Sequence, residues 1–74
     1  MDKASKETLG EALPREMARV RDRVMPAYIG LKGDAGRVAL VMMRGSLDQA
    51  AKAMAEGDIA SMIAAYEDLR SYDT

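Results

Sequence analysis

The stretch from Asp34 to Glu56 constrains the fold most, because its side-chain pattern predicts one long amphipathic helix. At 100° per residue, apolar side chains gather on one side of this helix and charged ones on the other. The apolar side holds Leu40, Met43, Leu47, Ala50, Ala51 and Met54. The charged side holds Arg37, Arg44, Asp48, Lys52 and Glu56, the last three spaced to form ion pairs one turn apart. Since residues 38–43 are all apolar, this part of the helix is expected to need partners on two sides.

A second helix is predicted before the glycines of residues 30–36. Pro14 suits the first position of a helix, where its missing N–H would have no partner. Pro26 interrupts the pattern and predicts a kink near Met25, with the helix continuing to about Ile29. One face carries Leu13, Met17, Val20, Val24, Tyr28 and Leu31. This helix is therefore expected to begin at Leu13, after a flexible tail over residues 1–12.

A third helix is predicted after Gly57, which suits a left-handed helix end, with Asp58 as the N-cap. Its apolar stripe comprises Ile59, Met62, Ile63, Tyr66 and Leu69. Asp34 is expected to cap the central helix, and the glycine-rich segment before it lacks the spacing of a phosphate-binding loop. The predicted fold is all-α: a small three-helix antiparallel bundle over residues 13–72 with a long central helix. A chain of 74 residues buries little surface, so we expect it to be oligomeric.

The composition excludes several kinds of chemistry. The chain has no cysteine and no histidine, which removes disulfides, thiolate or imidazole metal sites, and Ser-His or Cys-His catalysis. The carboxylate pairs Glu67/Asp68 and Asp48/Glu56 are exposed by helical phase, with nothing to tune them for acid–base work. We therefore predict a protein that is not an enzyme and holds no cofactor or metal. Without a membrane span or a signal-peptide pattern, we expect it to be cytoplasmic.

The charges are unevenly distributed. Residues 14–44 carry seven basic and three acidic side chains, a net charge of +4, whereas residues 45–74 carry two basic and six acidic ones, a net charge of −4. The two halves could fold against each other, or the basic half could keep a surface for an anionic partner. Arg15, Arg19 and Arg23 recur at every fourth position opposite the apolar stripe, where like charges repel. The array is either a solvated face or a binding site for carboxylates or phosphates.

Nucleic acid is a poor fit as this anion. In a helix-turn-helix protein of this sequence, the helix that enters the DNA groove would begin at Asp58. This helix also carries Glu67 and Asp68 but only one arginine, Arg70, so it would repel the phosphate backbone. The chain also has three tyrosines and no other aromatic residue for stacking on single strands.

A second candidate surface lies on the central helix, away from its main apolar stripe. Gly45 lies inside this helix at a cost of about 1 kcal/mol relative to alanine, which is tolerable where another helix approaches closely. We predict an interface between copies of the chain here, unless the first helix or the N-terminal tail covers it. Its members are Val38, Val41, Met42, Gly45 and Gln49.

Residues 13–21, LPREMARVR, followed by Pro26-x-Tyr28, Gly57-Asp58, Met62 and Tyr66-Glu67-x-Leu69, resemble short helical proteins encoded by bacteriophages and prophages. The resemblance spans most of residues 13–70 and carries no assigned activity. It implies a context in which small proteins act stoichiometrically, by blocking a host protein or by sequestering a host molecule.

The leading hypothesis is a non-enzymatic interaction protein that binds and modulates or inhibits a host protein. The alternatives are an oligomeric sponge for a nucleotide or another phosphorylated signal, and an accessory nucleic-acid-binding protein. In the sponge, arginines would meet phosphate and Tyr28 would stack on a base. The residues assigned to partner or anion binding are Arg15, Arg19, Arg23, Tyr28, Lys32 and Arg37.

Overall fold

The described residues fold into three helices that pack together, which confirms the predicted all-α fold. The computed structural model describes residues 8–30 and 33–72. The first helix is continuous but has three parts, namely α1 (Leu9–Arg19), η2 (Val20–Val24) and α2 (Met25–Ile29). The other two are α3 (Asp34–Glu56), with the predicted bounds, and α4 (Ile59–Arg70). The described residues contain no strand.

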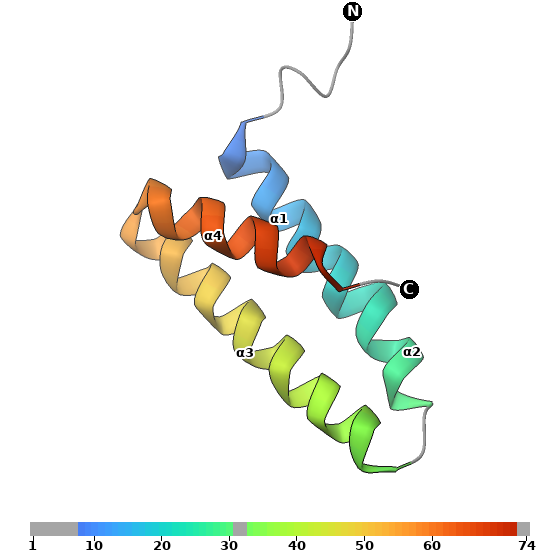
Figure 1. The fold of residues 1–74 in the computed structure, drawn as a ribbon. Helices are drawn as coiled ribbons and strands as arrows, with labels where there is room; N and C mark the ends of the chain where they lie inside the picture. The colour runs from blue at the N-terminus through green and yellow to red at the C-terminus, as the bar shows by residue number, and fades with distance from the viewer. Residues whose placement is uncertain (1–7, 31–32, 73–74) are drawn as a thin grey trace, which may run out of the picture.

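The helices form a thin plate of 42 × 30 × 15 Å, with α3 along one edge (Figure 1). At one end of the plate α2 packs against the beginning of α3, and from there α1 and α3 diverge. α4 turns back from the end of α3 and packs against both α3 and α1. All other helices therefore lie on one side of α3, and its outer side faces away from them.

The first helix begins four residues earlier than predicted, at Leu9. Glu11 accepts hydrogen bonds from the backbone N–H (3.1 Å) and the hydroxyl (3.0 Å) of Thr8, in a capping box. These bonds favour the carboxylate and lower the pKa of Glu11. The prediction of a start at Leu13 was wrong, because Pro14 lies inside the helix rather than at its first position. Of the predicted tail, residues 1–7 lie outside the described residues.

Pro26 is accommodated by the π-helical segment η2, as a local departure from α geometry inside a continuing helix. Proline has no N–H to donate, and its ring crowds the carbonyl four residues earlier. At the end of η2 the N–H of Met25 donates to the carbonyl of Val20, five residues back, so the turn before the proline is wider than an α-helical turn. The helix continues to Ile29, as predicted.

The core lies where α4 meets α1 and α3. Its members are Leu13, Val20, Val24, Met43, Ala50, Ala53, Met62, Ala65 and Leu69. The predicted stripe of α4 was partly wrong, because Ile59 and Ile63 are 59% and 46% exposed, whereas Ala65 is buried. On α3, Ala51 is exposed, whereas Ser46 is buried and its hydroxyl pairs with the Tyr72 hydroxyl at 2.8 Å.

Glycines precede α3 and follow it. Gly33 (φ 102°) is the N-cap of α3 and no side chain caps this end, so the predicted capping by Asp34 was wrong, since Asp34 is the first helical residue. Gly57 (φ 66°) ends α3 in the left-handed region, as predicted. Asp58 is the predicted N-cap of α4, and it accepts hydrogen bonds from the N–H (3.4 Å) and hydroxyl (2.8 Å) of Ser61.

The Asp58 cap predicts a stability that depends on acidity. Hydrogen bonds from Ser61 lower the folded-state pKa of Asp58 below its usual value. The stabilisation is therefore present above the unfolded-state pKa of about 4, and it is lost as the pH falls through the lower folded-state pKa. Asp58→Asn is expected to lower the melting temperature at neutral pH and to flatten its decline below about pH 4. Thermal melts from neutral to acid pH test this, and equal acid sensitivity in both proteins would contradict it.

Candidate binding surfaces

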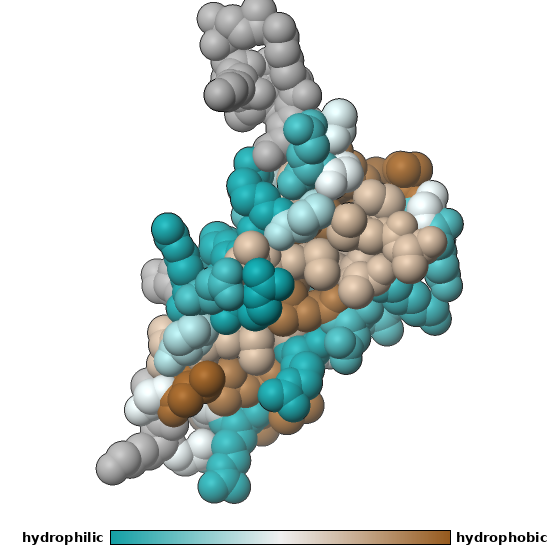
Figure 2. Space-filling model, turned by 180° about the vertical axis from the view of Figure 1, so that it is seen from behind, coloured by the Kyte–Doolittle hydropathy of each residue, from teal (hydrophilic) through white to brown (hydrophobic). Residues whose placement is uncertain are grey.

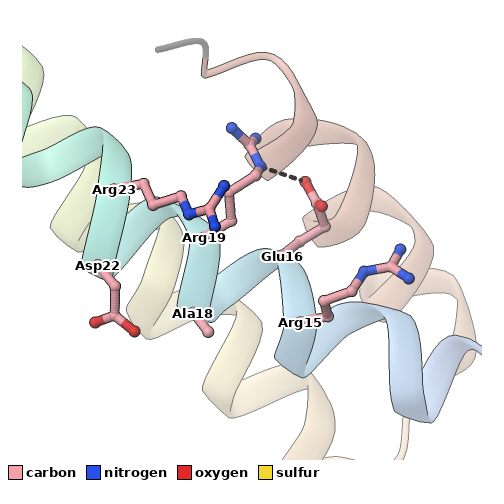
Figure 3. Close-up of a pocket in the computed structure, with 6 residues that line it drawn as sticks. All are labelled: Arg15, Glu16, Ala18, Arg19, Asp22 and Arg23. Atoms are coloured by element: carbon pink, nitrogen blue, oxygen red, sulfur yellow. Dashed lines mark hydrogen bonds and ion pairs between the residues drawn. The ribbon is translucent and has the colours of Figure 1, made fainter.

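A surface pocket of about 370 Å³ lies along the first helix, around the predicted arginine array. It is lined by Arg15, Glu16, Ala18, Arg19, Asp22 and Arg23 (Figure 3). The structure thus brings together three of the six residues predicted to bind a partner or an anion. We refer to these six lining residues as the basic pocket.

Arg19 holds the end of α4 in place. One of its terminal nitrogens donates to the carbonyl oxygens of Leu69 (3.0 Å) and Tyr72 (2.9 Å). The last carbonyls of a helix have no partners within the helix, and a cationic side chain there also offsets the negative end of its dipole. Arg19 is therefore first a structural residue that joins α1 to α4, and its guanidinium is fixed at the rim of the basic pocket (Figure 3).

The two acidic residues of the basic pocket are each paired with an arginine. Glu16, which is 9% exposed, accepts from Arg19 Nε at 3.2 Å. Asp22 pairs with Arg21 at 3.0 Å, and these contacts lower the pKa of Asp22 and raise that of Arg21. Figure 3 shows the Asp22 carboxylate pointing away from the arginines of the pocket. Both ion pairs lie within residues 14–44, so they do not join the basic half of the chain to the acidic half.

Arg23 is the residue best placed to meet a ligand. Its side chain is exposed and extends toward Arg19 (Figure 3), and within residues 8–30 and 33–72 no hydrogen bond or ion pair engages it. Arg15 is exposed on the same pocket, two helical turns earlier, and its guanidinium points toward α4. Two exposed guanidinium groups thus flank the fixed one of Arg19, and guanidinium groups form paired hydrogen bonds with carboxylates and phosphates.

The other predicted anion-binding residues do not reach this pocket. Tyr28 is half-buried against the hydrophobic core, and Arg37 is exposed on the first part of α3. Neither residue lines the basic pocket. Lys32 lies outside the described residues. The structure therefore does not place a tyrosine ring beside the arginines, as the stacking arrangement of the sponge hypothesis requires.

The residues predicted to form an interface between copies all lie exposed on the outer side of α3. Val38, Val41 and Met42 are 57%, 72% and 57% exposed. Gly45 and Gln49 are also exposed. We call these five residues the α3 patch. No helix of residues 8–30 and 33–72 covers the α3 patch, and residues 1–7 of the N-terminal tail lie outside the described residues.

No described residue packs closely against the backbone of Gly45. A Cβ atom at this position would meet nothing within 4 Å. Glycine in the middle of a helix costs about 1 kcal/mol relative to alanine. The close approach that would justify this glycine is therefore not made by any described part of the same chain.

Apolar surface also appears on the face of the plate that is turned away from the viewer in Figure 1. Figure 2 shows this face, where a band of apolar side chains crosses the molecule diagonally between hydrophilic margins. A plate only 15 Å thick has little interior in which to hide apolar side chains. Association with another molecule is a common way to cover such surface.

The described residues contain no group of three or more Asp or Glu side chains that could hold a metal ion. Where a carboxyl pKa is shifted, at Glu11, Asp22 and Asp58, hydrogen bonds lower it. A general acid at neutral pH needs a raised pKa instead. Across the two described stretches, no helix has the length and the apolar character needed to cross a membrane.

Sequence reasoning missed several features of these surfaces. The pairing of Glu16 with Arg19 is visible in their three-residue spacing, but the contact of Arg19 with α4 joins residues 50 and 53 positions apart. Glu16, Ala18 and Asp22 were not assigned to the pocket. The local spacing could have suggested these neighbours, but the α4 contact required the tertiary structure.

Comparison with known proteins supplies no relative for this chain: no family model, no curated protein and no solved structure matches it.

Proposed function

We propose that this chain is a small non-enzymatic protein that acts in the cytoplasm by stoichiometric binding of another protein. The basic pocket carries the proposal, because it presents exposed Arg15 and Arg23 on either side of the fixed Arg19. The partner would contribute carboxylates to this pocket. The resemblance to phage-encoded proteins suggests a host protein as the partner, with modulation or inhibition as the outcome.

The rigidity of the pocket supports a binding role. Arg19 is held at three oxygen atoms, so it keeps its place without a ligand. A preorganised guanidinium loses less side-chain entropy when a partner binds. Arg23 is one helical turn further and has an exposed side chain. A carboxylate in the pocket would therefore meet one arginine already in position and one that can adjust.

The test is affinity capture of the partner from host cells, followed by binding measurements with charge-reversal variants. Arg23→Glu and Arg15→Glu are each expected to weaken the complex by on the order of tenfold or more. Arg70→Glu is the matched control, because it makes the same change at an exposed arginine of α4 outside the lining of the pocket. Loss of affinity confined to the two pocket variants supports the proposal. Equal affinity in all three variants rejects the basic pocket as the contact.

A second candidate function is sequestration of a phosphorylated molecule or a nucleotide. It is favoured by the volume of the pocket, about 370 Å³, which lies within the range of small-molecule sites. A ligand at 100 times its Kd is expected to stabilise the folded protein by about 2.7 kcal/mol. A thermal-shift panel of nucleotides distinguishes the two functions. A flat response would reject sequestration and leave the protein-binding proposal standing.

A further inference from the structure

The outer side of α3 exposes the apolar Val38, Val41 and Met42 between charged side chains nearer its two ends, and no helix of the described chain covers this side. We propose that a second copy of this chain packs its α3 antiparallel against this side. The two-fold axis passes between the two helices at the level of Met42 and Met43 along α3. This inference concerns a surface separate from the basic pocket, and it stands or falls independently of the proposed function.

The charged and apolar side chains of this surface fall in three rows. At 100° per residue, Asp34, Val41, Gly45 and Lys52 lie within about 20° of its centre line. Arg37 and Asp48 lie on one edge, roughly 40–60° from that line. Val38, Met42, Gln49 and Glu56 lie on the opposite edge. One edge is therefore ionic, and the other is apolar as far as the two-fold axis.

Antiparallel pairing about this axis brings opposite charges together. The two-fold axis is perpendicular to both helices. Residues of the two copies therefore lie level with each other when their numbers add up to about 86. Each edge of one helix faces the same edge of the other helix. Arg37 of one copy then meets Asp48 of the second copy on the ionic edge. Asp34 of one copy meets Lys52 of the second copy on the centre line. Each pair occurs twice in the dimer.

The same register explains the presence of a glycine at position 45. Val41 of one copy lies level with Gly45 of the second copy, where the space beside the backbone is open. On the apolar edge, the two Met42 side chains meet beside the axis. Val41 is 72% exposed in the single chain, and burying it against a glycine lets the two helices approach closely. Such a contact offsets the cost of a glycine within the helix.

The charges select both the orientation and the partner. A parallel pair would set Asp34 against Asp34 and Lys52 against Lys52 on the centre line, and such like-charge contacts are unfavourable. It would also face the ionic edge of one copy with the apolar edge of the other, which leaves Arg37 and Asp48 without opposite charges. Within the described part of the chain, Arg37, Asp48 and Lys52 are exposed and engage in no ion pair. Their charges are therefore free to pair across an interface. Arg44 lies four residues before Asp48, so the same carboxylate also screens the two Arg44 side chains near the axis. This self-complementarity favours a second copy over an unrelated protein.

The test is a charge swap read out by sedimentation equilibrium over a range of protein concentrations. Arg37→Asp and Asp48→Arg are each expected to weaken the dimer by on the order of tenfold or more, because each creates two like-charge contacts. The double variant R37D/D48R restores opposite charges and is expected to recover most of the wild-type affinity. Asp68→Arg, an exposed charge reversal on α4, is the matched control and is expected to leave the dimer intact.

Gly45→Leu provides an independent check. The open space at Gly45 allows the single chain to accept the larger side chain, whereas the antiparallel register does not. The variant is expected to keep its helical circular dichroism and to sediment as a monomer. A wild-type protein that is monomeric at every concentration overturns the proposal. So does a dimer that is unaffected by the single charge reversals, or one that the double variant fails to restore.

Discussion

Leu69→Ala is expected to lower the free energy of unfolding by ~3 kcal/mol, because truncating a fully buried leucine removes apolar contacts and leaves a cavity. Leu69 is 0% exposed and lies in α4, the helix that packs against both α1 and α3. A domain of this length has roughly 4–11 kcal/mol of stability, so the change removes a large share of it. Urea denaturation followed by circular dichroism, at one fixed protein concentration, measures the loss.

Ile63→Ala is the matched control for this prediction. Ile63 lies on the same helix and loses the same number of carbon atoms, but its side chain is 46% exposed. We expect a cost below about 1 kcal/mol, because less apolar contact is removed and no closed cavity forms. If the two variants lose equal stability, the orientation of α4 described here is wrong.

Arg19→Met is expected to cost about 2 kcal/mol, because several buried or partly buried partners lose their hydrogen bonds together. Methionine keeps most of the apolar stem, so the main loss is the guanidinium itself. The change removes the hydrogen bonds to the carbonyls of Leu69 and Tyr72 and leaves the nearly buried Glu16 carboxylate without its ion pair. Equilibrium urea denaturation measures the effect.

Arg23→Met is the control for the Arg19 prediction, since Arg23 is an exposed arginine one helical turn away. Its expected cost is within about 0.5 kcal/mol, as for most surface substitutions. A double-mutant cycle with Glu16→Gln adds a second readout. The two changes are expected to be less costly together than the sum of the single changes, because the neutral amide no longer needs the cation. Additive costs, or equal costs for Arg19→Met and Arg23→Met, would contradict the structural role of Arg19.

The helices and most of their ends follow from local sequence. The bounds of α3 agree with the prediction because they depend on neighbours along the chain, namely the helical period and the glycine at each end. The same holds for Asp58 at the start of α4. The first helix shows the limit of such signals. The capping box of Thr8 and Glu11 is present in the sequence, but the preference of proline for the first helical position makes Pro14 a competing signal for a later start.

The sequence also indicated both candidate surfaces. The four-residue spacing of Arg15, Arg19 and Arg23 placed these residues on one face, and the structure forms a pocket there. The residues of the α3 patch are all exposed, as their position opposite the main apolar stripe suggested. Helical periodicity is sufficient in both cases, because each set lies on a single continuous helix.

Only the tertiary structure decided how the helices face one another and which arginine is committed to the fold. Ile59 and Ile63 belong to the most apolar stripe of α4, yet the small Ala65 is buried, because α4 lies against α1 and α3 at once. Arg19 has the same local spacing as Arg15 and Arg23, but its guanidinium donates to the carbonyl oxygens of Leu69 and Tyr72 at the end of α4. Periodicity determines which side chains share a face of a helix. The partner of that face depends on contacts between residues far apart in the sequence, which local patterns do not encode.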